Sequence, residues 1–579
     1  MAERLTNPDR ALNYLGTFLG LPAVRTDSGS SSFLGASSAG NSFNLALLKY
    51  GTGATYTYAL DPGALQNAEV ALGNWSHVLN GTKRIEPQPL AHIARILRQK
   101  DYTVFHNVSD FQLWLGAYAR RRYSQHPFPV TSVAYTVSYA RLASDFTRLL
   151  FADIQPYDSI ICPTNACKVA VENQLNHVAQ QYSQLAGREL RFGGRVSVIP
   201  YGVDTELYRE RDQQECRRQL NLPTDGVIIL CVGRFSVVNK MDLHPLFLAF
   251  RRMLAKALDT PVYLVLAGGD QENYSQALIE QASILGIRAK VIFWPNFSTS
   301  SRPMLYSAAD VFVSPSDNIQ ESFGLALTEA MASGLPIVAS DWNGYREIVH
   351  HGHTGYLVPT YWAPIPDISK LAPLTESNLD QLYAAQSLCI DVDDLTDHLY
   401  DLVSNQDKRI AMGKKAREYA VSYFDWKRVI RAYEALWLDL KAEALQRGWP
   451  VPEYSRSVFT PYYEAFAHYP TRMIDTTCMV ALTDFGASIY RKHEALPLPN
   501  LMMTVIDPAT VHAILRVARM ARWLRYDLTI EEIGMRVTKK LYLTADDILR
   551  AVLWMLKQDM LELAVKSLPK TGMTFYERQ

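Results

Sequence analysis

The sequence predicts an α/β protein with two doubly wound parallel-sheet domains, followed by an additional, mostly helical domain. Short apolar runs alternate with helical stretches over most of the chain, and this alternation begins twice. Alternating strands and helices favour parallel sheets that are covered by helices on both faces. The length of 579 residues agrees with several domains, because one hydrophobic core does not grow to this size.

The first domain is predicted over residues 31–195, after an arm at residues 1–30 that is rich in Gly, Ser and Pro. That composition predicts loose order, so we read the arm as flexible. The domain is expected to open with a strand at 32–36, a tight turn and a helix at 42–50. Later strands are expected at 55–60, 102–106, 130–134 and 159–162, with helices at 88–99 and 137–151.

The second domain, placed at residues 196–425, shows the same alternation more clearly. Near-continuous apolar runs predict buried strands at 227–233, 262–269, 290–294, 310–316 and 336–340. Helices are expected between them at 242–257, 273–286, 302–309 and 325–333. In open parallel sheets, ligands bind beyond the carboxyl ends of the strands. We therefore expect the functional site in a cleft between the two domains.

The remaining segments are an irregular insertion, a crossover helix and an extension. Three prolines argue against a long helix in the insertion at 360–390, and a helical pattern predicts the crossover helix at 426–450. The extension at 451–579 has helical apolar spacing and resembles a winged-helix module. Packing, self-association into a homo-oligomer, or docking of a protein or peptide are its expected uses.

The overall charge is balanced, with 58 basic and 58 acidic residues, so no net field attracts nucleic acid. Nucleic acid is therefore not expected as a partner, and peripheral membrane contact would need a local patch. The first 35 residues lack the pattern of a signal peptide, which favours a cytoplasmic protein with reduced cysteines. The basic run Arg120–Arg122 is read as a solvated helix face or an ion-pair partner, with an acceptor-binding or anionic patch as the alternative.

The stretch QESFGLALTEA contains Glu321 and Glu329, on either side of a Ser-Phe-Gly-Leu turn that opens a helix. Eight residues of helix place these carboxylates about 12 Å apart, close to the length from sugar to ribose in a nucleotide sugar. Carboxylate oxygens accept hydrogen bonds from hydroxyls. The free amides of Gly324 and Leu325 at the helix start would point at a pyrophosphate.

Residues 196–440 resemble the carboxyl-terminal half of a retaining GT-B glycosyltransferase of family GT4. The matching motifs, in order, are IPYGVD at 199–204, VGRF at 232–235 followed by Lys240, LAGGD at 266–270, the Glu-x7-Glu pair, ASGLPIVAS, NGYREIV and HTGYLVP. Several independent motifs in the right order make the resemblance specific. It implies two facing Rossmann-like domains with the nucleotide-sugar donor held by the second.

The resemblance also implies roles for the matching residues. Glu321 would hold hydroxyls of the donor sugar and Glu329 the ribose, while Arg234 and Lys240 would stabilise the negative charge that grows on the leaving diphosphate. The expected donor-binding set is Gly35, Gly233, Gly268, Gly269, Phe323, Gly324, Leu325 and Glu329. No metal and no cofactor are expected beyond a UDP- or GDP-linked sugar.

The first domain matches the family less closely. Gly35 and Gly40 correspond to its glycine-rich first loop. The family often carries a His at the position that is Tyr135 in this chain. His106, in VFHNVSD, is the substitute we nominate for a catalytic role.

These features predict a hexosyl transfer, with retention of anomeric configuration, to a hydroxyl-bearing acceptor that is a glycan, a lipid, a small molecule or a peptide. Two alternatives stay open: an epimerase or phosphorylase of the same fold, and a non-catalytic sugar-nucleotide sensor or scaffold. Incubation with donors alone separates the enzyme from the sensor, because only the enzyme slowly releases free sugar.

Overall fold

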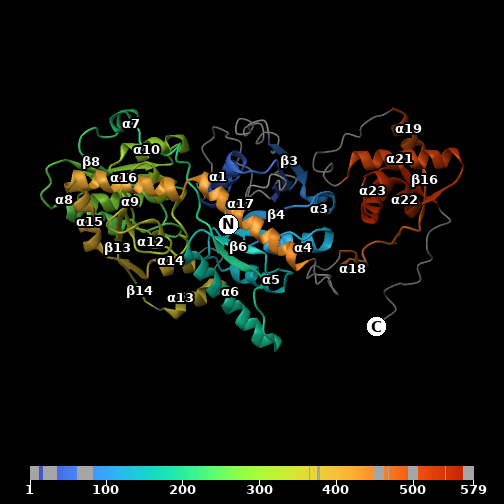
Figure 1. Cartoon of the computed structure of the whole chain (residues 1–579), viewed down its shortest axis with the longest axis horizontal. Helices are drawn as coiled ribbons and strands as arrows, with labels where there is room; N and C mark the ends of the chain where they lie inside the picture. Colours follow the sequence, from blue (N-terminus) through green and yellow to red (C-terminus); the bar gives the residue numbers. More distant parts are fainter. Residues whose placement is uncertain are drawn as a thin grey trace.

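The computed structural model describes residues 12–16, 35–61, 83–363, 365–374, 379–448, 462–466, 468–471, 473–492, 506–541 and 543–564. They form three domains that lie in a row, with the first domain in the middle, the second on the left and the third on the right in Figure 1. The first and second domains contain the two large sheets. The third domain is formed by residues 473–564.

The first domain is built on a seven-stranded sheet in the order β3-β2-β1-β4-β5-β6-β7, and every described pairing within it is parallel. Its strands are β1 (Asn13–Gly16), β2 (Thr55–Leu60), β3 (Arg84–Pro89), β4 (Val104–Asp110), β5 (Val130–Val133), β6 (Ser159–Cys162) and β7 (Arg195–Val198). The helices of its chain segment are α1 (Gly35–Tyr50), α3 (Ile93–Gln99), α4 (Leu113–Tyr123), α5 (Leu142–Phe151) and α6 (Asn165–Ala186).

The second domain contains a six-stranded parallel sheet in the order β10-β9-β8-β11-β12-β13. Its strands are β8 (Val227–Val232), β9 (Val262–Gly268), β10 (Val291–Pro295), β11 (Val311–Ser314), β12 (Ile337–Ser340) and β13 (Gly355–Val358). Its main helices are α7 (Gln213–Gln219), α8 (His244–Leu254), α9 (Tyr274–Ile284), α10 (Arg302–Ala308), α11 (Leu325–Ala332), α12 (Tyr345–Ile348), α15 (Val392–Ser404) and α16 (Gln406–Tyr423). Strands β8, β11 and β12 are buried along their whole length, which is why they read as apolar runs.

Helix α17 (Trp426–Arg447) leaves the second domain and packs on the first. Its Trp437 is fully buried in a cluster with residues of α1, β1 and β2. The Glu434 carboxylate accepts the backbone N–H of Thr52 at 2.6 Å. The chain therefore crosses between the domains twice, near residues 199–205 and 424–426. The two crossings are joined by the bond from the Val203 N–H to the Phe424 carbonyl, 2.8 Å.

The insertion after β13 is more regular than its prolines suggest. It forms a hairpin of β14 (Thr360–Trp362) and β15 (Leu388–Ile390), paired antiparallel. Two helices, α13 (Pro366–Leu371) and α14 (Leu379–Ala385), lie between these strands in sequence.

The third domain combines helices with a small antiparallel sheet in the order β17-β16-β18. Its elements are β16 (Met479–Leu482), α19 (Asp484–Lys492), α21 (Pro508–Trp523), β17 (Leu528–Thr529), α22 (Ile530–Leu541), α23 (Ala545–Lys557) and β18 (Leu561–Leu563), preceded by the short α18 (Tyr462–Ala465). It has a separate apolar core to which α21, α22 and α23 contribute. The prediction of a mostly helical additional domain is confirmed, and the small sheet was not foreseen.

The structure corrects three details of the prediction for the first domain. Residues 13–16, placed in a flexible arm, form β1 between β2 and β4. Gly35 and Ala36 begin α1 instead of ending a strand, and the rest of the expected strand lies outside the described residues. The boundary drawn at residue 196 falls inside β7, which belongs to the first sheet. These errors share a cause, because short strands at polar or Gly-rich segments carry little apolar signal.

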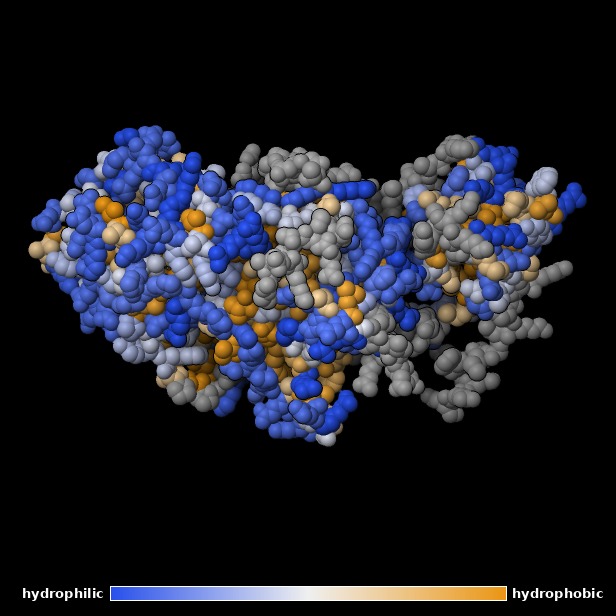
Figure 2. Space-filling model, viewed as in Figure 1, coloured by the Kyte–Doolittle hydropathy of each residue, from blue (hydrophilic) through white to orange (hydrophobic). Residues whose placement is uncertain are grey.

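The visible surface of the two large domains is mostly hydrophilic (Figure 2). Among the described residues, no helix is long and apolar enough to cross a membrane.

Candidate active site

The carboxyl ends of the two large sheets meet where the first and second domains touch. Thr164, after β6, donates to the carbonyl of Ser322 at 3.0 Å, and the Ser322 hydroxyl donates to the carbonyl of Tyr135, after β5. Glu347, in α12, accepts the backbone N–H of Asn165 at 2.8 Å at the start of α6. The loops that were predicted to form the site therefore lie at this junction.

Glu321 is the centre of a compact group at the junction. Its carboxylate forms an ion pair with Lys240 and accepts from the Tyr345 hydroxyl at 3.3 Å. The Asn343 side chain donates to the Glu321 backbone carbonyl, and Ser314 bonds the Tyr345 hydroxyl at 2.9 Å. The structure thus brings together two residues that the sequence placed 81 positions apart, Lys240 and Glu321.

This group holds opposite charges at low exposure. The side chains of Lys240 and Glu321 are 16% and 14% exposed. Burial by itself raises the pKa of Glu321, but the charge and hydrogen bond of Lys240 outweigh it and hold the pKa below its usual value. Burial likewise opposes the charge on Lys240, yet Glu321 and Tyr345 raise the pKa of this amine. Both side chains are therefore charged near neutral pH.

Arg234 lies in the same region, in the loop after β8. One of its terminal nitrogens donates to the Asn239 carbonyl at 3.0 Å. Its charge acts on the pKa of Lys240, which places the two cations close together. The predicted pair of cations is thus present at the carboxyl end of β8, with Glu321 beside it.

The loop that carries Lys240 is held by the loop that leads to Glu321. The Ser316 hydroxyl donates to the Lys240 carbonyl at 3.3 Å. The Asn318 amide donates to the Val238 carbonyl at 2.6 Å. These bonds fix the backbone on both sides of the ion pair, so the geometry is set by the scaffold.

Asp317 is an acid that sequence reasoning did not nominate. It is 4% exposed, and its carboxylate oxygens lie 3.3 Å from the backbone nitrogen of Asp242, which donates to them. Burial raises the pKa of Asp317 to about 7. Its position in DNIQE, directly after β11, is the signal that could have identified it.

The start of α11 matches the prediction of a turn that opens a helix. Gly324 has φ of 116°, a conformation that favours glycine, and the Tyr345 ring fills the space where a Cβ would lie. Leu325 is the first helical residue. Phe323 is buried against Tyr201 and donates its backbone N–H to the Glu321 carboxylate. The side chain of Phe323 therefore serves the core, while its backbone serves the site.

The glycines after β8 and β9 have packing reasons of their own. A Cβ on Gly268 would lie 1.6 Å from the Gly233 carbonyl oxygen, so Gly268 allows the two strand ends to approach. A Cβ on Gly233 would lie 3.2 Å from the Lys240 side chain. Gly269 accepts the backbone N–H of Phe235 at 2.8 Å. Their role in donor binding stays a prediction.

Glu329 lies in α11 within a second buried group. Its carboxylate pairs with Arg302 at 2.9 Å and accepts from the Tyr306 hydroxyl at 2.8 Å. The Tyr208 hydroxyl also bonds it. The Arg302 Nε is buried without a hydrogen-bond partner among the described residues. Sequence reasoning missed Arg302 and Tyr306, because nothing in their local sequence shows that α10 packs on α11.

His106, nominated for catalysis, lies in the core of the first domain and away from the junction. It is fully buried, packs on Phe43 and Trp437, and its Nδ1 bonds Thr131 at 2.8 Å. Burial lowers the pKa of His106 to about 3, so the ring is neutral. The nomination is therefore wrong in its premise of a cleft position, because α17 covers this strand.

Two other residues of the first domain take packing positions. Tyr135 stacks on Tyr201 with ring centroids 5.7 Å apart and is 6% exposed. Gly35 is the first residue of α1. The role predicted for Gly35 in donor binding stays a prediction.

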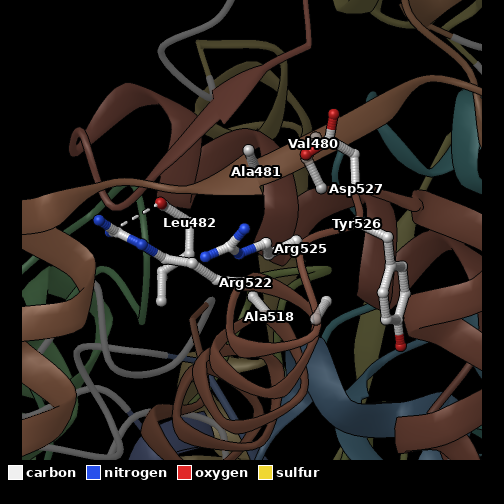
Figure 3. Close-up of a pocket in the computed structure, with 9 residues that line it drawn as sticks. Val480, Ala481, Leu482, Ala518, Arg522, Arg525, Tyr526 and Asp527 are labelled. Atoms are coloured by element: carbon white, nitrogen blue, oxygen red, sulfur yellow. Dashed lines mark hydrogen bonds between the residues drawn. The ribbon is translucent and has the colours of Figure 1, made fainter.

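A pocket of about 160 Å³ lies in the third domain between β16 and α21 (Figure 3). Arg522 and Arg525 line it, and Arg522 donates to the Leu482 carbonyl at 3.1 Å. Drug-sized ligands generally occupy pockets of roughly 300–1,000 Å³, so this pocket is too small for a nucleotide sugar. The third domain does not supply the donor site. Within the described part of the chain, no three His, Cys, Asp or Glu side chains gather as a metal site.

Comparison with known proteins agrees with this geometry. Residues 212–368 match the family model described as glycosyl transferases group 1. The D-inositol 3-phosphate glycosyltransferase of Acidothermus cellulolyticus is 34% identical over 183 residues, which are 31% of this chain and 40% of that protein. The enzyme of the same name from Geodermatophilus obscurus is 30% identical over 289 residues, 48% of this chain and 62% of that protein. The chain thus spans about two fifths of the length of the first of these relatives.

Solved structures of similar shape include two with sugar-related names. Sucrose-phosphate synthase from Thermosynechococcus elongatus has a TM-score of 0.48 at 20% identity, covering 75% of this chain and 100% of that one. The Anabaena protein HepE in complex with UDP has a TM-score of 0.47 at 18% identity, covering 76% and 100%.

The two facing parallel-sheet domains have the GT-B architecture. The second of them carries a domain of the glycosyl transferases group 1 family, which confirms the family predicted from the sequence motifs.

Proposed function

We propose that this protein is a retaining, metal-independent glycosyltransferase of the GT4 type. It transfers a sugar from a UDP- or GDP-linked donor to a hydroxyl-bearing acceptor. The observation that carries the proposal is the group of Glu321, Lys240 and Arg234 at the carboxyl ends of the second sheet, beside the start of α11. The relatives named for transfer to inositol phosphate support the same class of reaction.

In this proposal the donor lies along the start of α11. Glu321 accepts hydrogen bonds from the sugar hydroxyls, and Glu329 accepts from the ribose. Lys240 now pairs with Glu321, so the donor takes over part of that pairing as its phosphates approach Lys240 and Arg234. These cations stabilise the charge that develops on the leaving diphosphate as the glycosidic bond breaks.

With His106 in the core, the proposal assigns no protein side chain to attack on the anomeric carbon. The acceptor hydroxyl attacks from the face that the diphosphate leaves, and a departing phosphate oxygen takes the proton of that hydroxyl. The bond to the diphosphate breaks, the bond to the acceptor oxygen forms, and the anomeric configuration is kept.

The test is donor turnover by the full chain with UDP- and GDP-linked hexoses, alone and with acceptors. We expect slow release of free sugar, and a loss of about 100- to 1,000-fold in rate for Glu321→Gln or Arg234→Ala with an unchanged melting temperature. The matched control is Glu280→Gln, the same chemical change on an exposed residue of α9. Full turnover in Glu321→Gln refutes the site, and a transferred product of inverted anomeric configuration by proton NMR refutes retention.

A further inference from the structure

The insertion of the second domain exposes aromatic side chains close to the loop of Glu321. Trp362, in β14, is 55% exposed. Its ring packs edge to face on Trp342, with centroids 5.7 Å apart. The Trp342 indole N–H donates to the carbonyl of Asn318 at 3.1 Å. A continuous contact therefore leads from the Glu321 loop through Trp342 to a solvent-exposed indole.

The fold places this pair at the functional edge of the sheet. Trp342 follows β12, and Trp362 lies a few residues after β13, so both come after the carboxyl ends of parallel strands. The insertion also reaches the first domain, where Ser138 donates to the side chain of the buried Gln381 at 3.1 Å. The exposed indole thus belongs to the junction of the two domains and to the same side as Glu321.

The same loop offers polar groups for a hydroxylated ligand. Gln320, next to Glu321, donates to the Tyr139 hydroxyl at 2.6 Å across the junction. Its carbonyl oxygen is buried and has no partner among the described residues. An unpaired buried acceptor has a free-energy cost that a ligand hydroxyl would remove. An aromatic face beside an unused acceptor suits a ligand with both an apolar face and hydroxyl groups.

We propose that Trp362, supported by Trp342, is a stacking platform for a sugar ring of the acceptor. The apolar face of a pyranose carries C–H groups that are attracted to the negative face of an indole. The hydroxyls at the ring edge reach polar groups such as the Gln320 carbonyl. The inference rests on the proposed transfer reaction for the ligand's role as acceptor, and it assigns that acceptor to the carbohydrate class.

The neighbouring Tyr361 supplies a matched control. It is 56% exposed and stands next to Trp362 in the same strand, so its side chain projects from the opposite face of the hairpin. It donates to the Asp391 carboxylate at 3.1 Å and has no part in the platform. Tyr361→Ala and Trp362→Ala therefore remove similar exposed area from one strand on two different faces.

The experiment is saturation-transfer NMR on the full chain with UDP, using the methyl glycosides of glucose, galactose, mannose and N-acetylglucosamine. We expect saturation of the ring C–H protons of at least one glycoside, a loss of about 10-fold in its affinity for Trp362→Ala, and partial recovery in Trp362→Phe. Tyr361→Ala should bind like the unaltered chain. Equal losses in the two alanine variants, or no glycoside that depends on Trp362, overturn the platform.

Two further arms separate this inference from its neighbours. Co-sedimentation with phosphatidylglycerol vesicles that depends on Trp362, without glycoside binding, would assign the patch to a membrane and overturn the proposal. Donor hydrolysis that depends on Glu321 is measured in parallel with the NMR. If hydrolysis occurs while glycosides ignore Trp362, the platform fails and the transferase stands. If glycosides stack on Trp362 while no donor is cleaved, the platform stands and the transferase fails.

Discussion

The two parallel-sheet domains use buried charge in different ways. In the first domain, Arg120 and Asp158 form an ion pair at 2.6 Å with side chains 2% and 0% exposed. In the second domain, Lys240 and Glu321 at the strand ends keep 16% and 14% exposure, as do Arg302 and Glu329 with 22% and 11%. A charge pair sealed from solvent holds the fold together, whereas a pair with residual exposure at the carboxyl edge is reachable by a ligand.

The largest effect is expected from the sealed pair. Arg120 also donates to the Phe128 and Asp153 carbonyls, so Arg120→Met leaves Asp158 buried without its cation. We expect a loss of about 3–5 kcal/mol in the free energy of unfolding of the first domain, measured by urea denaturation. Arg122→Met, at an exposed position of the same helix, should stay within about 0.5 kcal/mol. Equal costs in both variants would remove the distinction between sealed and reachable charge.

Asp317 tests the same comparison from the other side, since it is a buried acid of the second domain without a cation. The folded protein raises its pKa from 3.8 to about 7, so the folded state binds this proton more tightly than the unfolded state. Stability from this group is therefore full below about pH 4, falls as the pH rises to about 7, and stays low above it. The shift corresponds to on the order of 4 kcal/mol.

Asp317→Asn should therefore raise the melting temperature by several degrees at pH 8 and leave it nearly unchanged at pH 4. The amide keeps an oxygen that accepts from the Asp242 backbone N–H. Thermal unfolding at the two pH values measures the difference. A variant that gains as much at pH 4 as at pH 8 would show that ionisation of Asp317 has no part in the effect.

A smaller effect is expected where the two domains are joined. Glu347 caps the start of α6 from the opposite domain, accepting two backbone N–H groups at 2.8 Å. Glu347→Ala should cost about 1–2 kcal/mol and loosen the junction. Small-angle scattering should then show a larger radius of gyration than for the unaltered chain or for Glu418→Ala, an exposed change in α16. An unchanged radius would mean that the remaining contacts hold the domains without this cap.

The second domain could be predicted from the sequence because buried parallel strands read as apolar runs between turn residues. All five predicted strands correspond to β8 to β12, and the acids, cations and helix start of the site follow from motifs next to those strands. The missed strand β13 is short and contains only two large aliphatic residues, Leu357 and Val358, after Gly355 and Tyr356.

The first domain was harder to predict for reasons that its structure makes plain. Strand β3 reads RIEPQP, with two prolines and two charges, which is tolerated because it is the last strand of its sheet. His106 was placed in a cleft because it sits at a strand, yet Trp437, far along the chain, covers it. Local sequence does not show which distant helix will cover a strand.

That distant cover has a consequence for how the protein can be made. Residues Trp426, Tyr433 and Trp437 complete an aromatic cluster whose other members lie before residue 200. A chain that stops at residue 425 would leave the face of the first sheet open to water. During synthesis, the ribosome must therefore deliver the entire second domain before the first can close, and expression of the first domain alone would require residues 426–447 to be attached to it.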